Sequence, residues 1–140
     1  HDIGDFLLMR FASEEYHRIH LFADEKDMPL RTCTDQVLGF SSSEVGHALA
    51  DRWNLQDNIQ NVIRNVHQSD ENESSLVNIT RVADKFCRQK KLGYVTDLHG
   101  TDLSTEELES VGLEDSFFEN HEDHLLEEIE SSKVFISSGK

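Results

Sequence analysis

The sequence has none of the features that mark membrane-spanning, disulfide-linked or zinc-binding proteins. No apolar run approaches the roughly 18 residues that a transmembrane helix needs, and no stretch resembles a signal peptide. The two cysteines, Cys33 and Cys87, lie far apart without C-x-x-C spacing, so we predict that both are reduced core residues. These absences favour a cytoplasmic protein that makes no contact with a membrane.

Positive charge is also scarce. Thirteen Lys and Arg stand against 28 Asp and Glu, and the formal net charge is -15 at pH 7. A chain of this charge repels phosphate groups, so we expect no direct binding of nucleic acid. The imbalance is greatest between Asp102 and Glu130, where the chain has twelve Asp and Glu and no Lys or Arg. Such a run is usually a solvated helix face and sometimes a docking surface for a basic partner.

Two adjacent aromatic residues, Phe117 and Phe118, lie inside this acidic run. One face of a helix can bury only one of two neighbouring residues well. If Phe117 is the residue left exposed, we expect it to be an interaction residue, either for a protein partner or for a segment of the chain upstream of His1.

Strand signals are absent as well. No stretch alternates apolar and polar residues convincingly, whereas apolar residues recur at helical spacing along most of the chain. We predict an all-α fold of about eight helices, in which Gly4 lets another backbone approach the first helix closely. The clearest helices are expected over 1–11, 13–22, 30–38, 76–91 and 115–135, with a short one opened by a capping box of Ser104 and Glu107.

The rest of the fold is predicted to be organised around a helical hairpin over residues 39–68. A capping box of Ser41 and Glu44 opens its first helix. We predict that Trp53 and Ile63 anchor the core between the two helices. The apolar residues at helical spacing are Val45, Ala48, Leu49 and Trp53 in the first helix, and Ile59, Val62, Ile63 and Val66 in the second.

Several short motifs occur in the order that is found in a known family. They are His1-Asp2-Ile3-Gly4, then LGF at 38–40, SEVG at 43–46, WNL at 53–55, Ile63 with His67, and VAD at 82–84. Together they resemble the HDOD family of output domains, within the HD phosphohydrolase superfamily. The resemblance implies that residues 1–95 are the C-terminal part of an HDOD-like helical domain. Residues 96–140 are then expected to be an acidic helical extension that packs on it.

The resemblance also implies a metal site that this chain has partly lost. Where the family often has aspartate and histidine, this chain has Ser41 and Ser42, and where the family has paired histidines it has Val66 and His67. Asp5 stands where catalytic relatives carry a lysine. Helical spacing predicts that positions 42 and 66 both point toward the core, where a metal ion would lie. The superfamily's first histidine would precede His1. Because the chain begins at His1 without an initiator methionine and inside a helical pattern, we infer that it is a fragment.

The remaining candidates for metal ligands are few, and each missing ligand removes a large part of the binding free energy. For His67, a neutral histidine in the core is favoured over metal ligation. We therefore expect no bound metal, no cofactor and no catalytic residue. The remnant candidates are His1, Asp2, His67 and Asp84.

Two functions are compatible with this sequence. The first is a non-catalytic signalling or regulatory module that acts through protein–protein interaction in bacterial signal transduction. The alternative is a metal-dependent HD-type phosphohydrolase that acts on nucleotides or cyclic dinucleotides. The number of metal ligands distinguishes the two, and Ser42 and Val66 favour the non-catalytic module.

Overall fold

The computed structural model describes residues 1–68, 74–92 and 97–137, and within these residues it has eight helices and no strand. The predicted all-α fold is therefore confirmed. The helices are α1 (Ile3–Phe11), α2 (Ser13–Lys26), α3 (Leu30–Leu38), α4 (Ser42–Arg52), α5 (Asp57–Asn65), α6 (Ser75–Gln89), α7 (Thr105–Ser110) and α8 (Phe117–Ser137). Among the described residues, no helix has the length and apolar character that crossing a bilayer requires.

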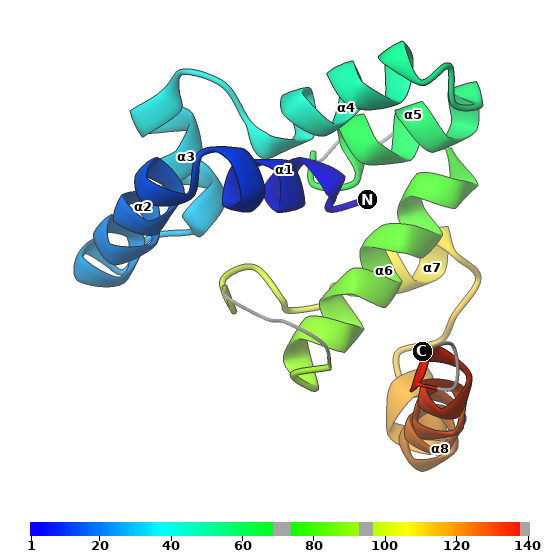
Figure 1. The fold of residues 1–140 in the computed structure, drawn as a ribbon. Coiled ribbons are helices and arrows are strands. Elements are labelled where there is room, and N and C mark those ends of the chain that lie inside the picture. Colours follow the sequence, from blue (N-terminus) through cyan, green and yellow to red (C-terminus); the bar gives the residue numbers. More distant parts are fainter. Residues whose placement is uncertain (69–73, 93–96, 138–140) are drawn as a thin grey trace.

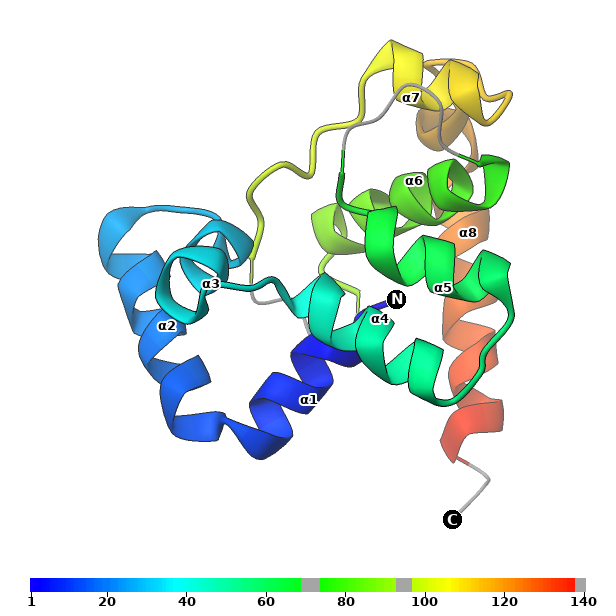
Figure 2. The same cartoon turned by 90° about the horizontal axis from the view of Figure 1, so that it is seen from above.

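The helices form two groups that meet at α1, one with α2 and α3 and the other with α4, α5 and α6 (Figures 1 and 2). The helices α2 and α3 form a pair at one end, and the α4–α5 hairpin packs against α1 near the N-terminus. The helix α6 follows the hairpin, and α7 and α8 lie on the far side of α6. The N-terminus therefore lies near the middle of the molecule, between α1, α5 and α6.

Each group has its own core. The larger core joins α1, α2 and α3, and its buried residues are Leu8, Tyr16, Ile19, Ala23, Leu30 and Cys33. A smaller cluster of Val62, Val66 and Val77 joins α5 to α6. Both cysteines are free thiols, but only Cys33 is buried as predicted, because Cys87 is half-buried beside an open cleft.

The closest contact between helices is the crossing of α1 over α4. A Cβ atom on Gly4 would lie 1.7 Å from the carbonyl oxygen of Ser42. On the facing helix, a Cβ atom on Gly46 would lie 2.9 Å from Cγ2 of Ile63 and 3.1 Å from the backbone nitrogen of Gly4. The two backbones meet only because both positions lack a side chain, which confirms the predicted role of Gly4.

This crossing determines which face of α4 is buried. The buried positions are the small residues Ser42, Gly46 and Ala50, which recur every four residues. The predicted stripe of larger residues lies beside this face, and Trp53 is 59% exposed. The prediction that Trp53 anchors the core is therefore wrong. The prediction for Ile63 is confirmed, because that side chain is 5% exposed.

The local signals at helix ends were predicted more accurately than the buried faces. Ser41 with Glu44 and Ser104 with Glu107 form the two predicted capping boxes. Gly39 ends α3 in the left-handed region, with φ of 77°. These signals depend on a few consecutive residues, so packing elsewhere does not change them.

We expect Gly4→Ala to destabilise the protein by more than about 3 kcal/mol, because the new methyl group would push the backbone of α4 away from α1. Urea unfolding measures the effect. The matched control is Gly39→Ala, where a Cβ atom meets no atom within 4 Å and only the left-handed backbone, at about 1 to 2 kcal/mol, opposes the change. Equal losses for the two variants would contradict the close crossing.

Candidate functional site

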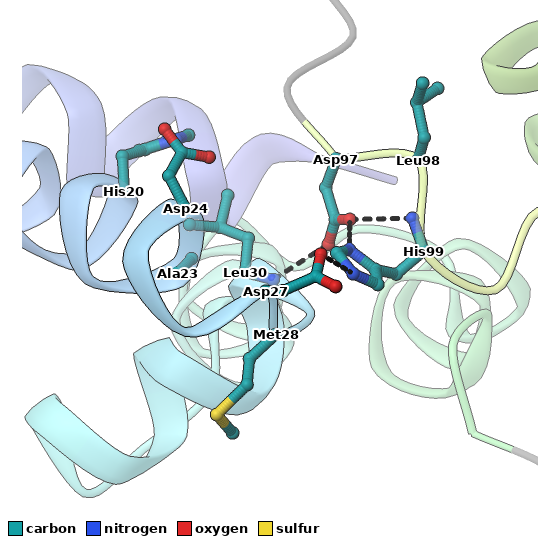
Figure 3. A pocket seen from close by; sticks show the side chains of 9 residues that line it. All are labelled: His20, Ala23, Asp24, Asp27, Met28, Leu30, Asp97, Leu98 and His99. Atoms are coloured by element: carbon teal, nitrogen blue, oxygen red, sulfur yellow. Dashed lines mark hydrogen bonds and ion pairs between the residues drawn. The ribbon is translucent and has the colours of Figure 1, made fainter.

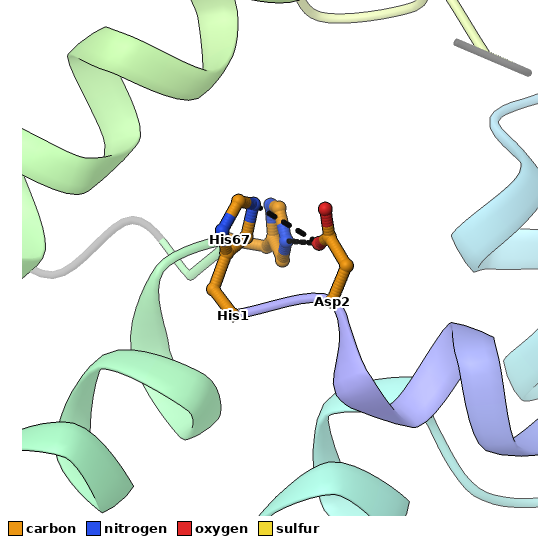
Figure 4. A group of neighbouring side chains, drawn as sticks. All are labelled: His1, Asp2 and His67. Carbon is orange, nitrogen blue, oxygen red and sulfur yellow. Dashed lines mark ion pairs between the residues drawn. The ribbon is translucent and has the colours of Figure 1, made fainter. Parts of the chain in front are cut away.

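Three helices bring the predicted remnant ligands together. His1 and Asp2 precede α1, His67 follows α5, and Asp84 lies in α6. The Nε2 atom of His1 lies 3.0 Å from Oδ1 of Asp2 and 3.3 Å from Oδ1 of Asp84. The Nε2 atom of His67 lies 3.7 Å from the same oxygen of Asp2 (Figure 4). All four remnant candidates therefore belong to one site.

The donor set of this site fits a divalent metal ion in part. The ligand atoms of His1, Asp2 and His67 lie within 4.8 Å of one another, and imidazole nitrogen with carboxylate oxygen is a set that transition metals accept. His67 is half-buried and faces Asp2, so it is better placed for ligation than the sequence indicated. Ser42 and Val66 are both buried, as predicted, and the valine side chain offers no ligand atom.

The charges in this site stabilise one another. Burial alone would lower the pKa of His1, but the carboxylates of Asp2 and Asp84 outweigh it and raise that pKa to about 9. Burial opposes ionisation of both carboxylates, yet the contact with His1 holds the pKa of each below its ordinary value. Burial lowers the pKa of His67 despite the nearby Asp2. The histidines therefore differ at neutral pH: His1 is cationic and His67 is neutral.

The site opens into a cleft of about 980 Å³ between α1, α3 and α6. Its apolar wall includes Phe6 and Met9 of α1, which are 61% and 41% exposed. Its polar wall includes Tyr16, whose hydroxyl donates to Oδ1 of Asp5 at 2.7 Å. Arg31 of α3 also lines the cleft, and burial lowers its pKa. A molecule in this cleft would meet both apolar surface and charge.

Sequence reasoning missed one group beside the site. Arg88 of α6 lies 3.6 Å from Oδ2 of Asp84, four residues earlier on the same helix, and it also donates to the backbone oxygens of Asp97 and His99. The i, i+4 spacing of Asp84 and Arg88 was a signal in the sequence. The contacts with Asp97 and His99 had no such signal, because they come from tertiary structure.

The aromatic pair of α8 lies away from this cleft. The ring of Phe118 stacks on Phe86 of α6 with centroids 4.5 Å apart. Phe117 meets the edge of Phe118 and stacks on His121, with centroids 4.6 Å apart. Phe117 is therefore half-buried, and the cover comes in part from its own helix. Its role in interaction stays a prediction.

Known proteins are similar to this chain in sequence and in fold. Residues 1–69 match the family model described as the HDOD domain. One similar solved structure is that of an HDOD domain protein of unknown function from Geobacter sulfurreducens, with 24% sequence identity and a TM-score of 0.65. The match covers 99% of this chain and 49% of that protein, so this chain spans about half of its length. No curated protein matches this chain.

We expect Asp84→Asn to lower the pKa of His1, because it removes one of the two carboxylates that raise it. An NMR titration of the ring, in chelator-treated protein, measures this value. Because the folded pKa of His1 lies above its ordinary 6.5, the interaction stabilises the fold fully below that pH, and the stability is lost as pH rises through about 9. Asp51→Asn, which changes an exposed carboxylate of α4, is the control. A titration near the ordinary value in the parent protein would contradict this account.

Proposed function

We propose that this chain, whose residues 1–69 match the HDOD domain family, is a non-catalytic regulatory module. It would act through contacts with other proteins in bacterial signal transduction, in the cytoplasm. The observation that supports this most is the chemistry of two inward positions. Ser42 is buried with its carbonyl oxygen against Gly4, and Val66 is fully buried directly before His67. Both stand where the family resemblance implies ligands.

The loss of these ligands lowers the affinity for an ion steeply. Catalytic zinc sites ordinarily use three protein ligands that are held in a fixed geometry, with further groups that orient them. Here one of the three, Asp2, is largely exposed, and His1 already binds two carboxylates through one ring nitrogen. Binding of an ion by His1 would require that histidine to lose its proton, because metal ligands must be deprotonated.

A phosphohydrolase is the second candidate, and one observation favours it. His1, Asp2 and His67 present three ligand atoms within 4.8 Å, with Asp84 beside them. A metal ion held there would polarise a phosphoryl oxygen and lower the pKa of a bound water molecule. The adjoining cleft of about 980 Å³ has room for a nucleotide-sized molecule. The two candidates therefore differ in whether this remnant site holds an ion.

We predict that the protein, purified after growth with added iron, manganese and zinc, holds far less than one equivalent of any of them. Elemental analysis of the parent protein and of Asp2→Ala decides this. A full equivalent that disappears in the variant would refute the non-catalytic module. Hydrolysis of cyclic dinucleotides or nucleoside phosphates with added metal, abolished by Asp2→Ala, would establish the enzyme instead.

For the interaction surface, we propose the acidic extension of residues 96–140. Helices α7 and α8 of this extension contact α6 and the residue after it through Lys85 with Glu107 at 2.7 Å, the Phe86–Phe118 stack, and Lys90 with Glu122 at 2.5 Å. Within the described part of the chain, the carboxylates of α8 beyond Glu122 are exposed, and Phe117 lies at the start of the same helix. An acidic surface with an aromatic residue suits a basic, partly apolar surface on another protein.

We expect Phe117→Ser to weaken the binding of a basic amphipathic helical peptide and to leave the melting temperature nearly unchanged, because that ring packs mainly on its own helix. Fluorescence anisotropy in low and high salt measures the binding. The matched control is Phe11→Ser, which removes a 79% exposed ring from α1. A large loss of stability would place Phe117 in the core. Equal binding by both variants, insensitive to salt, would show α8 to be solvated surface only.

A further inference from the structure

Residues 97–102, called the strap here, connect the two groups of helices. Along α6, the guanidinium of Arg88 donates to the backbone oxygens of Asp97 and His99, both at 2.8 Å. Gln89 donates to the oxygen of Thr101 at 2.8 Å, and Lys85 donates to that of Asp102 at 2.9 Å. Three side chains of α6 therefore bind the backbone of the strap along its length.

At its other side the strap binds the start of α3 (Figure 3). Oδ2 of Asp97 accepts a hydrogen bond from the backbone N–H of Leu30 at 2.8 Å. The helix has no capping side chain of its own at that end, because Pro29 precedes it. Asp97 therefore serves as the missing cap, and its negative charge suits the positive end of the helix dipole.

His99 completes this contact. Its Nδ1 atom lies 2.8 Å from Oδ1 of Asp97, and its Nε2 atom lies 3.4 Å from Oδ1 of Asp27 at the end of α2. The ring therefore lies between two carboxylates, one on the strap and one on the α2–α3 pair, as Figure 3 shows. The other titratable groups that line this pocket are His20 and Asp24 of α2, and Arg88 of α6 binds the backbone of His99.

We propose that His99 is a pH-sensitive clasp: in its cationic form it joins Asp97 to Asp27 and holds the strap on α3, and in its neutral form it releases the strap and opens the cleft. A cationic imidazole donates through both ring nitrogens, whereas a neutral one has a single N–H. After the proton is lost, one carboxylate has no donor from the ring, and the two negative charges repel each other.

The pKa of His99 is shifted in the direction that this geometry predicts. The hydrogen bond to Asp97 is the main cause of a raised pKa of His99. The clasp therefore stabilises the closed state fully below the ordinary His pKa of 6.5 and loses that effect as pH rises through the raised value. Burial would raise the pKa of Asp97, but its bonds with His99 and Leu30 outweigh this and lower it. Asp97 thus stays ionised wherever His99 titrates.

The strap forms part of the cleft beside the remnant metal site. Asp97, His99 and Gly100 line it on one side, and the thiol of Cys87 in α6 lines it on another. Release of the strap from α3 would therefore widen access to Cys87. Cys33 is fully buried between α2 and α3 and would stay protected. The clasp does not depend on what the cleft binds, so failure of the proposed function would not contradict it.

The two native thiols provide the test. The rate at which iodoacetamide alkylates Cys87 is measured by mass spectrometry in the parent protein and in His99→Gln, at about pH 6 and about pH 8.5, on either side of the ordinary His pKa of about 6.5. Comparison of the two proteins at one pH cancels the change in thiolate fraction. We expect the variant to react several-fold faster at the lower pH and equally fast at the higher pH.

Two further measurements make the result decisive. Alkylation of Cys33 in step with Cys87 would indicate global unfolding and overturn the proposal, as would a ratio of rates that does not change with pH. Amide hydrogen exchange at Leu30, whose N–H binds Asp97, should be faster in His99→Gln than in the parent protein at the lower pH. Unchanged exchange at Leu30 would also overturn the proposal.

The variant Asp27→Asn retains the bond between His99 and Asp97. It should therefore shift the release of the strap to lower pH without abolishing that release.

Discussion

The crossing of α1 over α4 at Gly4 is the contact on which the rest of the molecule depends. It has no room for a Cβ atom, so it fixes the distance between the helices and the depth at which α1 begins. His1 and Asp2 immediately precede the first turn of α1, and the crossing therefore places them beside the end of α5. The glycine of the His-Asp-Ile-Gly motif thus positions the two polar residues before it, whether or not a metal ion is bound.

The sequence was sufficient for features that depend on neighbouring residues. The capping boxes at Ser41 and Ser104 were predicted correctly because each needs only a few consecutive residues. The buried face of α4 was predicted one position away from its true place. Periodicity gives most weight to large apolar residues such as Trp53, whereas this helix buries small ones, because what packs on it is the backbone of another helix.

In the candidate site, too, local features were predictable and features that depend on tertiary structure were not. The inward direction of positions 42 and 66 was predictable, because Ser42 begins α4 and Val66 directly follows α5, both at helical spacing from apolar neighbours. The convergence of His67 with Asp2 was implied only by the family resemblance, since it depends on the α1–α4 crossing and on where α5 ends. The contact of the strap with α3 was not predictable from the sequence. Asp97 caps a helix that begins 67 residues earlier in the chain, and no local pattern connects the two positions.

The scarcity of positive charge explains why so much of the structure depends on α6. This helix and the residue after it carry four cations, Arg81, Lys85, Arg88 and Lys90, and each binds another segment of the chain. Arg81 donates to the backbone oxygens at the end of α5, and the other three hold the strap, α7 and α8. These four cations therefore have partners inside the molecule. The exposed carboxylates of α8 beyond Glu122 give this part of the described chain an acidic surface that attracts ions from solvent or a basic surface on another protein.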